Sequence, residues 1–174
     1  MLLGIAMFVL GLFAWTLIEY VIHGFMSHIF ETFATPLHAA HHRDPRAVFT
    51  VGAWLPVAIV TAIVLPVFGV TPGVIVWLGI VAGFLCYELF HYRIHFAEPV
   101  CKLEQRLRLR HLAHHFEAPG QIFGVTNRWW DRLFGSEPDP ARMKAMEASM
   151  GKIAPLTGAS NFRLILRPWF FLSR

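Results

Sequence analysis

Three long apolar runs dominate the pattern of hydrophobic and polar positions along the chain. They cover residues 1–22, 51–70 and 73–90, and their only charged side chains are Glu19 and Glu88. A helix rises ~1.5 Å per residue and needs about 20 apolar residues to cross a bilayer, so each run is long enough, the third only just. We therefore predict an all-α integral membrane protein with about three transmembrane helices. The glycine and proline cluster at 69–73 predicts a tight hairpin between the second and third.

The composition supports a membrane protein. Of the 174 residues, 56% are hydrophobic and 15% are charged, whereas a soluble domain carries about 25% charged residues. This excludes an ordinary soluble globule, and sixteen Phe and six Trp exclude a disordered chain. A cleaved signal peptide is disfavoured for the first run, which lacks a basic leading segment and a small-residue cleavage pattern.

The positive charges indicate the orientation. All fifteen Lys and Arg lie in Arg43–Arg46, at Arg93, or from Lys102 onward. If the chain begins outside and crosses three times, all of them face the cytoplasm, as the positive-inside bias expects. The excess of basic residues is then explained by the membrane orientation and by attraction to anionic lipid headgroups. We expect no nucleic-acid partner, because no basic module stands apart from the membrane part.

We predict one domain, 1–174, whose cytoplasmic helical part covers 91–160 and whose interfacial tail covers 161–174. The Leu-, Arg- and His-rich stretch Glu98–Phe116 predicts a helix near the interface, and Ala141–Met150 predicts a polar helix. The tail mixes aromatic residues with arginine and is too short and charged for a fourth span.

Ten histidines form four clusters in two similar halves. Each half has a pair at the predicted cytoplasmic end of a span and a triplet in the polar segment beyond it. The first half contributes His23, His28, His38, His41 and His42, and the second contributes His91, His95, His111, His114 and His115. Three crossings bring all ten to one side of the membrane, where they can converge.

The spacing of these histidines favours metal binding. Positions three and four apart share a helix face, so we expect His91 and His95 to point together, and the members of each triplet likewise. His23 and His28 are five apart, about 140° around an ideal helix, and can face one ion only if the helix ends or unwinds, for example at Gly24. Without a shared ligand, such imidazoles would repel when charged and leave nitrogens unpaired when buried. Ten ligands exceed the four to six that one ion takes, so we predict two metal ions.

Two carboxylates precede the histidine pairs by one helical turn. Glu19 lies four residues before His23, and Glu88 lies three before His91. We expect each to accept a hydrogen bond from the second N–H of its histidine, which fixes the tautomer. The alternative is a carboxylate that reaches toward the headgroups or caps a helix; the recurrence in both halves favours the first interpretation.

At these motifs the sequence resembles the membrane fatty acid hydroxylase and sterol desaturase superfamily, and within it the fatty acid 2-hydroxylases. The matching stretches are LFAWTLIEY at 12–20, HAAHH at 38–42, YELFHYRIHF at 87–96, HLAHHF at 111–116 and FGVTNRWWDRLFG at 123–135. The resemblance implies an oxidoreductase that hydroxylates a long-chain fatty acyl lipid. It also implies a di-iron centre held by all ten histidines, with dioxygen as co-substrate. Zinc can replace iron in a purified sample but cannot activate dioxygen.

The sequence departs from that family in two respects. It has no counterpart of the helix that precedes residues 1–22 in the 2-hydroxylases, nor of the cytochrome b5-type domain that they commonly carry. We therefore expect a separate electron donor, a ferredoxin or cytochrome with its reductase, and a bacterial inner membrane as the location, with the active site on the cytoplasmic side.

Aromatic and polar residues near the histidines are candidate substrate contacts: Tyr87, Tyr92, Asn127, Trp129 and Trp130. We expect Asn127 to cap a helix and the two tryptophans to line an acyl groove. The alternative is plain packing at the membrane interface, where aromatic residues are enriched.

Two other functions stay open. A carotenoid ring hydroxylase, or another lipid oxidase of the superfamily, would share the histidines, but in carotenoid hydroxylases the second pair is spaced five apart, whereas His91 and His95 are four apart. A non-catalytic membrane haem or metal carrier would need only one or two histidine pairs, placed inside the bilayer.

Overall fold

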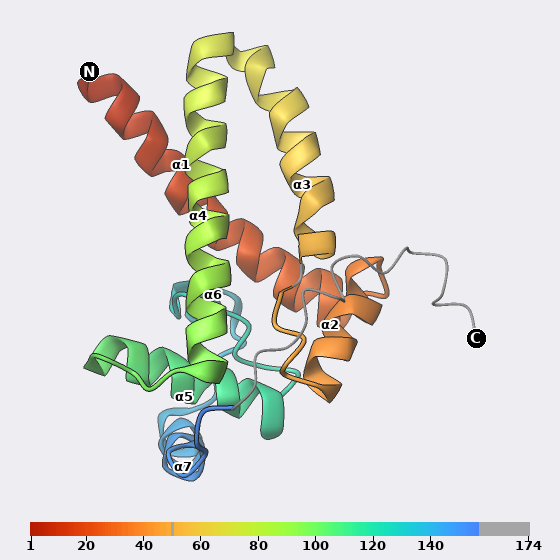
Figure 1. The fold of residues 1–174 in the computed structure, drawn as a ribbon, viewed down its shortest axis with the longest axis vertical. Helices are drawn as coiled ribbons and strands as arrows, with labels where there is room; N and C mark the ends of the chain where they lie inside the picture. Colours follow the sequence, from red (N-terminus) through yellow and green to blue (C-terminus); the bar gives the residue numbers. More distant parts are fainter. Residues whose placement is uncertain (50, 157–174) are drawn as a thin grey trace.

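The computed structural model describes residues 1–49 and 51–156, which fold into helices joined by loops, with no strand among them. The first two helical segments are continuous, because α1 passes directly into a π-helix, η1 (Figure 1). In chain order the elements are α1 (Leu2–Tyr20), η1 (Val21–Ile29), α2 (Ala34–Arg43), α3 (Val51–Val64), η2 (Leu65–Phe68), α4 (Val70–Phe96), α5 (Lys102–Phe116), α6 (Trp129–Phe134) and α7 (Pro140–Met150).

Two of the three predicted spans are helices long and apolar enough to cross a membrane. These are Leu2–Ile29, which is α1 with η1, and Val70–Phe96, which is α4. The remaining predicted span, 51–70, is an apolar helix of shorter length: α3 ends at Val64 and η2 extends it to Phe68, so a crossing there stays a prediction. The predicted hairpin is present: Gly69 has a positive φ of 112°, which glycine adopts without strain, and it turns the chain into α4.

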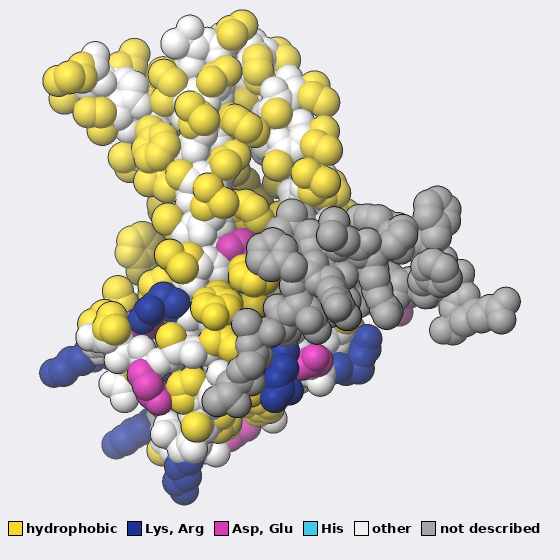
Figure 2. All heavy atoms as spheres, in the orientation of Figure 1, with side chains coloured by type: hydrophobic (Ala, Val, Ile, Leu, Met, Phe, Trp, Pro, Cys, Tyr) yellow, Lys and Arg dark blue, Asp and Glu magenta, His cyan; other side chains and the backbone are white. Residues whose placement is uncertain are grey.

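The long apolar helices expose most of their surface. Only 28% and 33% of their apolar windows is buried, which is unlike the core helix of a soluble protein. In Figure 2 the end of the molecule formed by α1, α3 and the first part of α4 is covered by hydrophobic side chains, and the visible Lys and Arg lie at the opposite end. A contiguous apolar surface marks an interaction site. Because this surface lies on helices that are long and apolar enough to cross a bilayer, we conclude that the protein is membrane-associated.

Glycines let α1 cross α4 closely. A Cβ added at Gly11 would lie 2.1 Å from the carbonyl oxygen of Val76, and one added at Gly79 would lie 2.2 Å from that of Phe8. At Gly83 the added atom would meet the Trp15 side chain. Small residues at such crossings bring helix backbones together where hydrophobic association between helices is weak.

The polar end is built from α5, α6 and α7. In Figure 1, α5 and α7 lie beneath α4, and α6 lies beside its lower part. The predicted helices are present there, although the first begins at Lys102 rather than at residue 98. A second small core joins α5 to α7 through Leu112, Met143 and Met146. Arg108 on α5 donates to the carbonyl of Ile94 and so ties this end to α4. The predicted interfacial tail, 161–174, lies outside the described residues.

The helix crossing generates a stability prediction. Gly11→Ala places a methyl group against backbone, which cannot move aside without separating α1 from α4, so we expect a loss of about 1–3 kcal/mol in unfolding free energy. The measurement is the thermal melting midpoint of the detergent-purified protein. Gly4→Ala is the matched control, since its Cβ would meet only the end of the Ile75 side chain at 3.9 Å. Equal melting midpoints for the two variants would contradict the close-crossing interpretation.

Candidate metal centre

The ten histidines converge into two groups of five at the base of the long helices. In each group the candidate ligand nitrogens lie within 4.8 Å of one another. The first cluster contains His23, His28, His38, His42 and His114, and the second cluster contains His41, His91, His95, His111 and His115. The two clusters are adjacent, because the rings of His42 and His115 stack with centroids 4.2 Å apart.

The clusters exchange one histidine between the halves of the sequence. Each cluster contains the histidine pair of one half of the sequence and the first and last histidines of that half's triplet. Its fifth member is the middle histidine of the other half's triplet. His41 therefore joins the second cluster, and His114 joins the first. Neither half of the chain supplies a complete five-histidine set.

This exchange corrects the expectation that the three members of each triplet point together. His38 and His42 are four residues apart and share one face of α2, whereas His41 directly precedes His42 and is turned about 100° from it. The same spacing on α5 separates His114 from His111 and His115. The helical period thus divides each triplet between two sites.

The first histidine pair is brought together by the π-helix and not by unwinding at Gly24. A π-helix bonds residues five apart, so His23 and His28 come into line on η1, as the bond from the Phe30 N–H to the Phe25 carbonyl, 2.8 Å, illustrates. Gly24 has a different role: a Cβ there would lie 2.7 Å from the Phe123 ring. Its small size admits the loop that carries Phe123.

Nitrogen lone pairs face one another in the first cluster. His23 Nδ1 and His114 Nδ1 each lie at hydrogen-bond distance from a backbone carbonyl, of Phe123 and Gln121. Carbonyls only accept, so both Nδ1 atoms carry the proton and both Nε2 atoms present lone pairs. These two Nε2 atoms are 3.1 Å apart. Two lone pairs at this distance repel unless a cation lies between them.

Other distances in the two clusters fit a shared ion equally well. His38 Nε2 lies 2.8–3.1 Å from Nε2 of His23, His28 and His42, and His111 Nε2 lies 3.0 Å from those of His91, His95 and His115. One imidazole cannot satisfy three such neighbours with a single N–H. Two nitrogens bound at right angles to one metal, at about 2.1 Å each, would be about 3.0 Å apart.

Burial keeps the imidazoles neutral and their lone pairs free for a metal. Desolvation, helped by neighbouring histidines, holds the pKa of His38, His41, His111, His114 and His115 well below the usual 6.5. For the less buried His42, desolvation lowers the pKa to about 4. All five residues of the second cluster are buried, whereas His28 and His42 of the first are partly exposed. Metal binding requires this neutral form.

The prediction that Glu19 accepts a hydrogen bond from His23 is wrong. Glu19 is fully buried, and its carboxylate accepts from the backbone N–H groups of Val125, 2.7 Å, and Thr126, 2.9 Å, and from the Thr126 hydroxyl. The loop that contains these residues comes between Glu19 and the histidine. His23 instead bonds the Phe123 carbonyl of that loop.

Among the described residues, no hydrogen bond joins the buried Glu88 to His91. His91 Nδ1 lies 3.5 Å from the hydroxyl of Tyr87. Tyr87 is buried and also lines a cavity of about 10 Å³ beside His23 and His38. The role of Glu88 toward His91 stays a prediction.

The other predicted substrate contacts lie farther from the clusters or pack against the helices. Tyr92 stacks on Phe96, and Trp130 donates from Nε1 to the Thr16 hydroxyl on α1, at 3.0 Å. Trp129 is exposed. The Asn127 side chain accepts from the N–H of Trp129, the first residue of α6, but the cap position of this helix is Arg128, so Asn127 precedes the cap by one residue.

Sequence reasoning missed the residues that hold the loop against the first cluster. Asp131 is fully buried and forms an ion pair with the buried Arg110, 3.0 Å. The backbone carbonyls of Gln121 and Phe123 were not predicted either, because every residue has a carbonyl and its contacts cannot be read from the type of side chain. The available signal was a lone Asp within the aromatic stretch at 129–134.

Comparisons with known proteins agree with this geometry. The fatty acid hydroxylase family matches residues 8–136. The chain is 32% identical over 147 residues to the dihydroceramide fatty acyl 2-hydroxylase FAH1 of Arabidopsis thaliana, covering 75% of this chain and 60% of that protein. It is 33% identical over 144 residues to the fatty acid 2-hydroxylase of Mus musculus, covering 75% of this chain and 39% of that protein.

A solved structure has the same fold. The hydroxylase domain of full-length scs7p superimposes with a TM-score of 0.68 at 27% identity, covering 90% of this chain and 60% of that one. The chain thus spans about 60% or less of the length of these relatives. With the family match over most of the chain, and with histidine clusters at its centre, this protein belongs to the fatty acid hydroxylase family.

Proposed function

We propose that this chain is the catalytic part of a membrane di-iron mono-oxygenase that hydroxylates a long-chain fatty acyl lipid. The observation that carries the proposal is the pair of adjacent five-histidine clusters, in which the Nε2 lone pairs of His23 and His114 face each other. The names of the relatives, dihydroceramide fatty acyl 2-hydroxylase and fatty acid 2-hydroxylase, support an acyl substrate.

Each cluster would hold one iron ion through its five imidazoles. When bound, the two ions supply the activation of dioxygen, of which one atom enters a C–H bond and the other leaves as water, with two electrons and two protons from outside. The chain's own residues keep the ligands neutral, hold them at fixed spacing and limit the access of water. Zinc fits the same nitrogen donors but is redox-inert.

Two small cavities that share Trp54 as a lining residue support a lipid substrate. Trp15, Trp54 and Phe84 line a cavity of about 70 Å³ between α1, α3 and α4. Trp54 also lines the small cavity beside His23 and His38. We propose that the acyl chain approaches between these helices, with Tyr87 next to the histidines. Substrate contact by Tyr92, Asn127, Trp129 and Trp130 is part of the same proposal.

The proposed topology has three crossings, with α3 and η2 forming the shortest. The N-terminus lies outside, and the histidine clusters face the cytoplasm at a bacterial inner membrane. Helices α5–α7 and the visible Lys and Arg side chains lie at the same end of the molecule, which supports this orientation (Figure 2). Electrons come from a separate ferredoxin or cytochrome with its reductase.

His115→Ala tests the function. It removes one ligand of the second cluster and leaves four imidazoles around an incomplete site, so we expect hydroxylated lipid to fall to background and one ion to be lost. The two forms are expressed in a carotenoid-producing host with iron and an electron-transfer pair. Total lipids are then hydrolysed, and fatty acids and pigments are compared by mass spectrometry.

Lys102→Ala is the matched control, because Lys102 is exposed on the same helix, α5. Hydroxy acids made by the wild type and the control, but not by His115→Ala, would support the proposal. Oxygenated pigments without hydroxy acids would point to the carotenoid alternative. A haem absorption band in the purified wild type, with no lipid product, would favour the non-catalytic carrier.

Acidification is expected to destabilise the metal-loaded protein between about pH 6.5 and pH 4. In the unfolded chain histidines take up protons below about pH 6.5, whereas in the folded protein the pKa of His42 is about 4 and the pKa values of the more buried imidazoles are also low. The unfolded state therefore binds more protons in this window, and folding stability falls as the pH decreases. Melting midpoint and metal content are measured at each pH. A melting midpoint that stays constant between pH 6.5 and pH 4 would contradict this expectation.

A further inference from the structure

The loop at 118–126 contacts the first cluster through its backbone. The carbonyl of Gln121 accepts from His114 Nδ1 at 2.8 Å, and the carbonyl of Phe123 accepts from His23 Nδ1. In the second cluster, His111 Nδ1 and His115 Nδ1 have no hydrogen-bond partner among the described residues. The loop therefore orients ligands of one cluster and not of the other.

A strained residue lies between these two carbonyls. Ile122 has a φ of +61°, a left-handed conformation that a β-branched residue rarely adopts. Its N–H donates to the Ser136 carbonyl, 3.0 Å, and its side chain is buried in the core formed by α5 and α7. Strain of this kind persists only where the surroundings hold the backbone, and it concentrates at functional sites.

Two carboxylates hold the next four residues of the loop. Asp131 accepts from the N–H groups of Phe123, 2.7 Å, and Gly124, 3.1 Å. Glu19 accepts from those of Val125 and Thr126, 2.7 and 2.9 Å. Four consecutive backbone donors thus bind two buried carboxylates, and the charge of Asp131 is balanced by Arg110.

Gly124 makes the close approach of the loop to Asp131 possible. A Cβ at this position would lie 2.0 Å from the Asn127 carbonyl oxygen and 3.0 Å from Asp131 Oδ2. The loop and the carboxylate are fitted to each other, which distinguishes this contact from a general surface ion pair.

We propose that Asp131 and Glu19 are positioning residues for one metal site only: they fix the loop so that its carbonyls orient His114 and His23, and the first cluster depends on them to retain its ion. The second cluster does not. This inference rests on the proposed metal function. Loss of a group that orients a metal ligand typically weakens metal binding about 10–100-fold.

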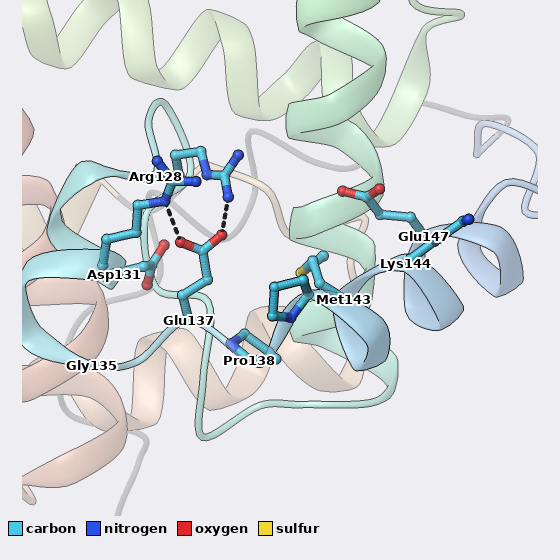
Figure 3. Close-up of a pocket in the computed structure, with 10 residues that line it drawn as sticks. Arg128, Asp131, Gly135, Glu137, Pro138, Met143, Lys144 and Glu147 are labelled. Atoms are coloured by element: carbon cyan, nitrogen blue, oxygen red, sulfur yellow. Dashed lines mark hydrogen bonds and ion pairs between the residues drawn. The ribbon is translucent and has the colours of Figure 1, made fainter.

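Glu137 provides a matched control beside Asp131. Its carboxylate also pairs with Arg110, 3.0 Å, with Arg128, as Figure 3 shows, and with Arg132. Its side chain accepts no hydrogen bond from the described loop N–H groups. Neutralising Glu137 therefore disturbs the same charge network without releasing the loop.

The experiment compares Asp131→Asn with Glu137→Gln and the wild type. Each full-length protein is purified in detergent, loaded with Fe(II) without oxygen, and dialysed against a chelator, and bound iron is counted by mass spectrometry. We expect about two ions per chain in the wild type and in Glu137→Gln, and about one in Asp131→Asn.

Double variants assign the lost ion to a cluster. His115→Ala impairs the second cluster, so adding Asp131→Asn to it should leave almost no iron. His42→Ala impairs the first cluster, so adding Asp131→Asn to it should change the iron content little. The reverse pattern would overturn the proposal, as would Asp131→Asn retaining both ions or losing both while its melting curve stays cooperative.

Thr126→Val keeps the test decisive if Asp131→Asn does not fold. It removes only the hydroxyl bond to Glu19, and we expect one of the two ions to leave about 10-fold faster in a chelator time course. Unchanged release of both ions would overturn the proposal. Failure of the proposed function gives a different result, in which the wild type binds two ions but makes no hydroxylated lipid. The iron counts of the variants then still decide whether the loop positions the ligands of the first cluster.

Discussion

The central constraint on this structure is the mutual repulsion of buried imidazole lone pairs, which a bound cation would relieve. In the first cluster the tautomers of His23 and His114 are fixed by backbone carbonyls, so their Nε2 atoms face each other as acceptors. Burial prevents relief by protonation, because desolvation disfavours the charged imidazole. A folded chain with these contacts is therefore built around positive charge supplied from outside the sequence. The π-helix, the split triplets and the fixed loop all serve to present nitrogen atoms to such a charge.

The sequence predicts the helices and the metal-site residues better than it predicts which residues contact one another in the folded chain. Apolar runs located α1 and α4, and the histidine spacing located both halves of the metal centre, because helical periodicity is a local property. Periodicity did not predict the course of the chain at His23 and His28, since nothing in the nine residues of η1 distinguishes a π-helix from an α-helix. The exchange of His41 and His114 between clusters also depends on how α2 and α5 meet, which is a long-range contact.

Glu19 shows why a correct site residue can receive the wrong partner. Its position one turn before His23 suggested a direct bond, but the buried loop at 123–126 needs acceptors for its own N–H groups. A buried carboxylate in the last turn of an apolar helix equally needs donors. Placing the two together satisfies both requirements. Glu19 then affects the histidine only indirectly, through the backbone of the loop. No pattern of side chains along the sequence records such a path.

The exchange of histidines between the two clusters has a topological consequence. Contacts within the first cluster join residues 72 and 91 positions apart, His42 and His23 each with His114. An ion bound there closes a long loop of chain, much as a disulfide does, and restricts the unfolded state accordingly. His41 gives the second cluster the same property in the opposite direction. With ions bound in both clusters, the proposed metal centre would act as a reversible double cross-link between the N-terminal and C-terminal halves, and the supply of metal would govern how firmly these halves are held together.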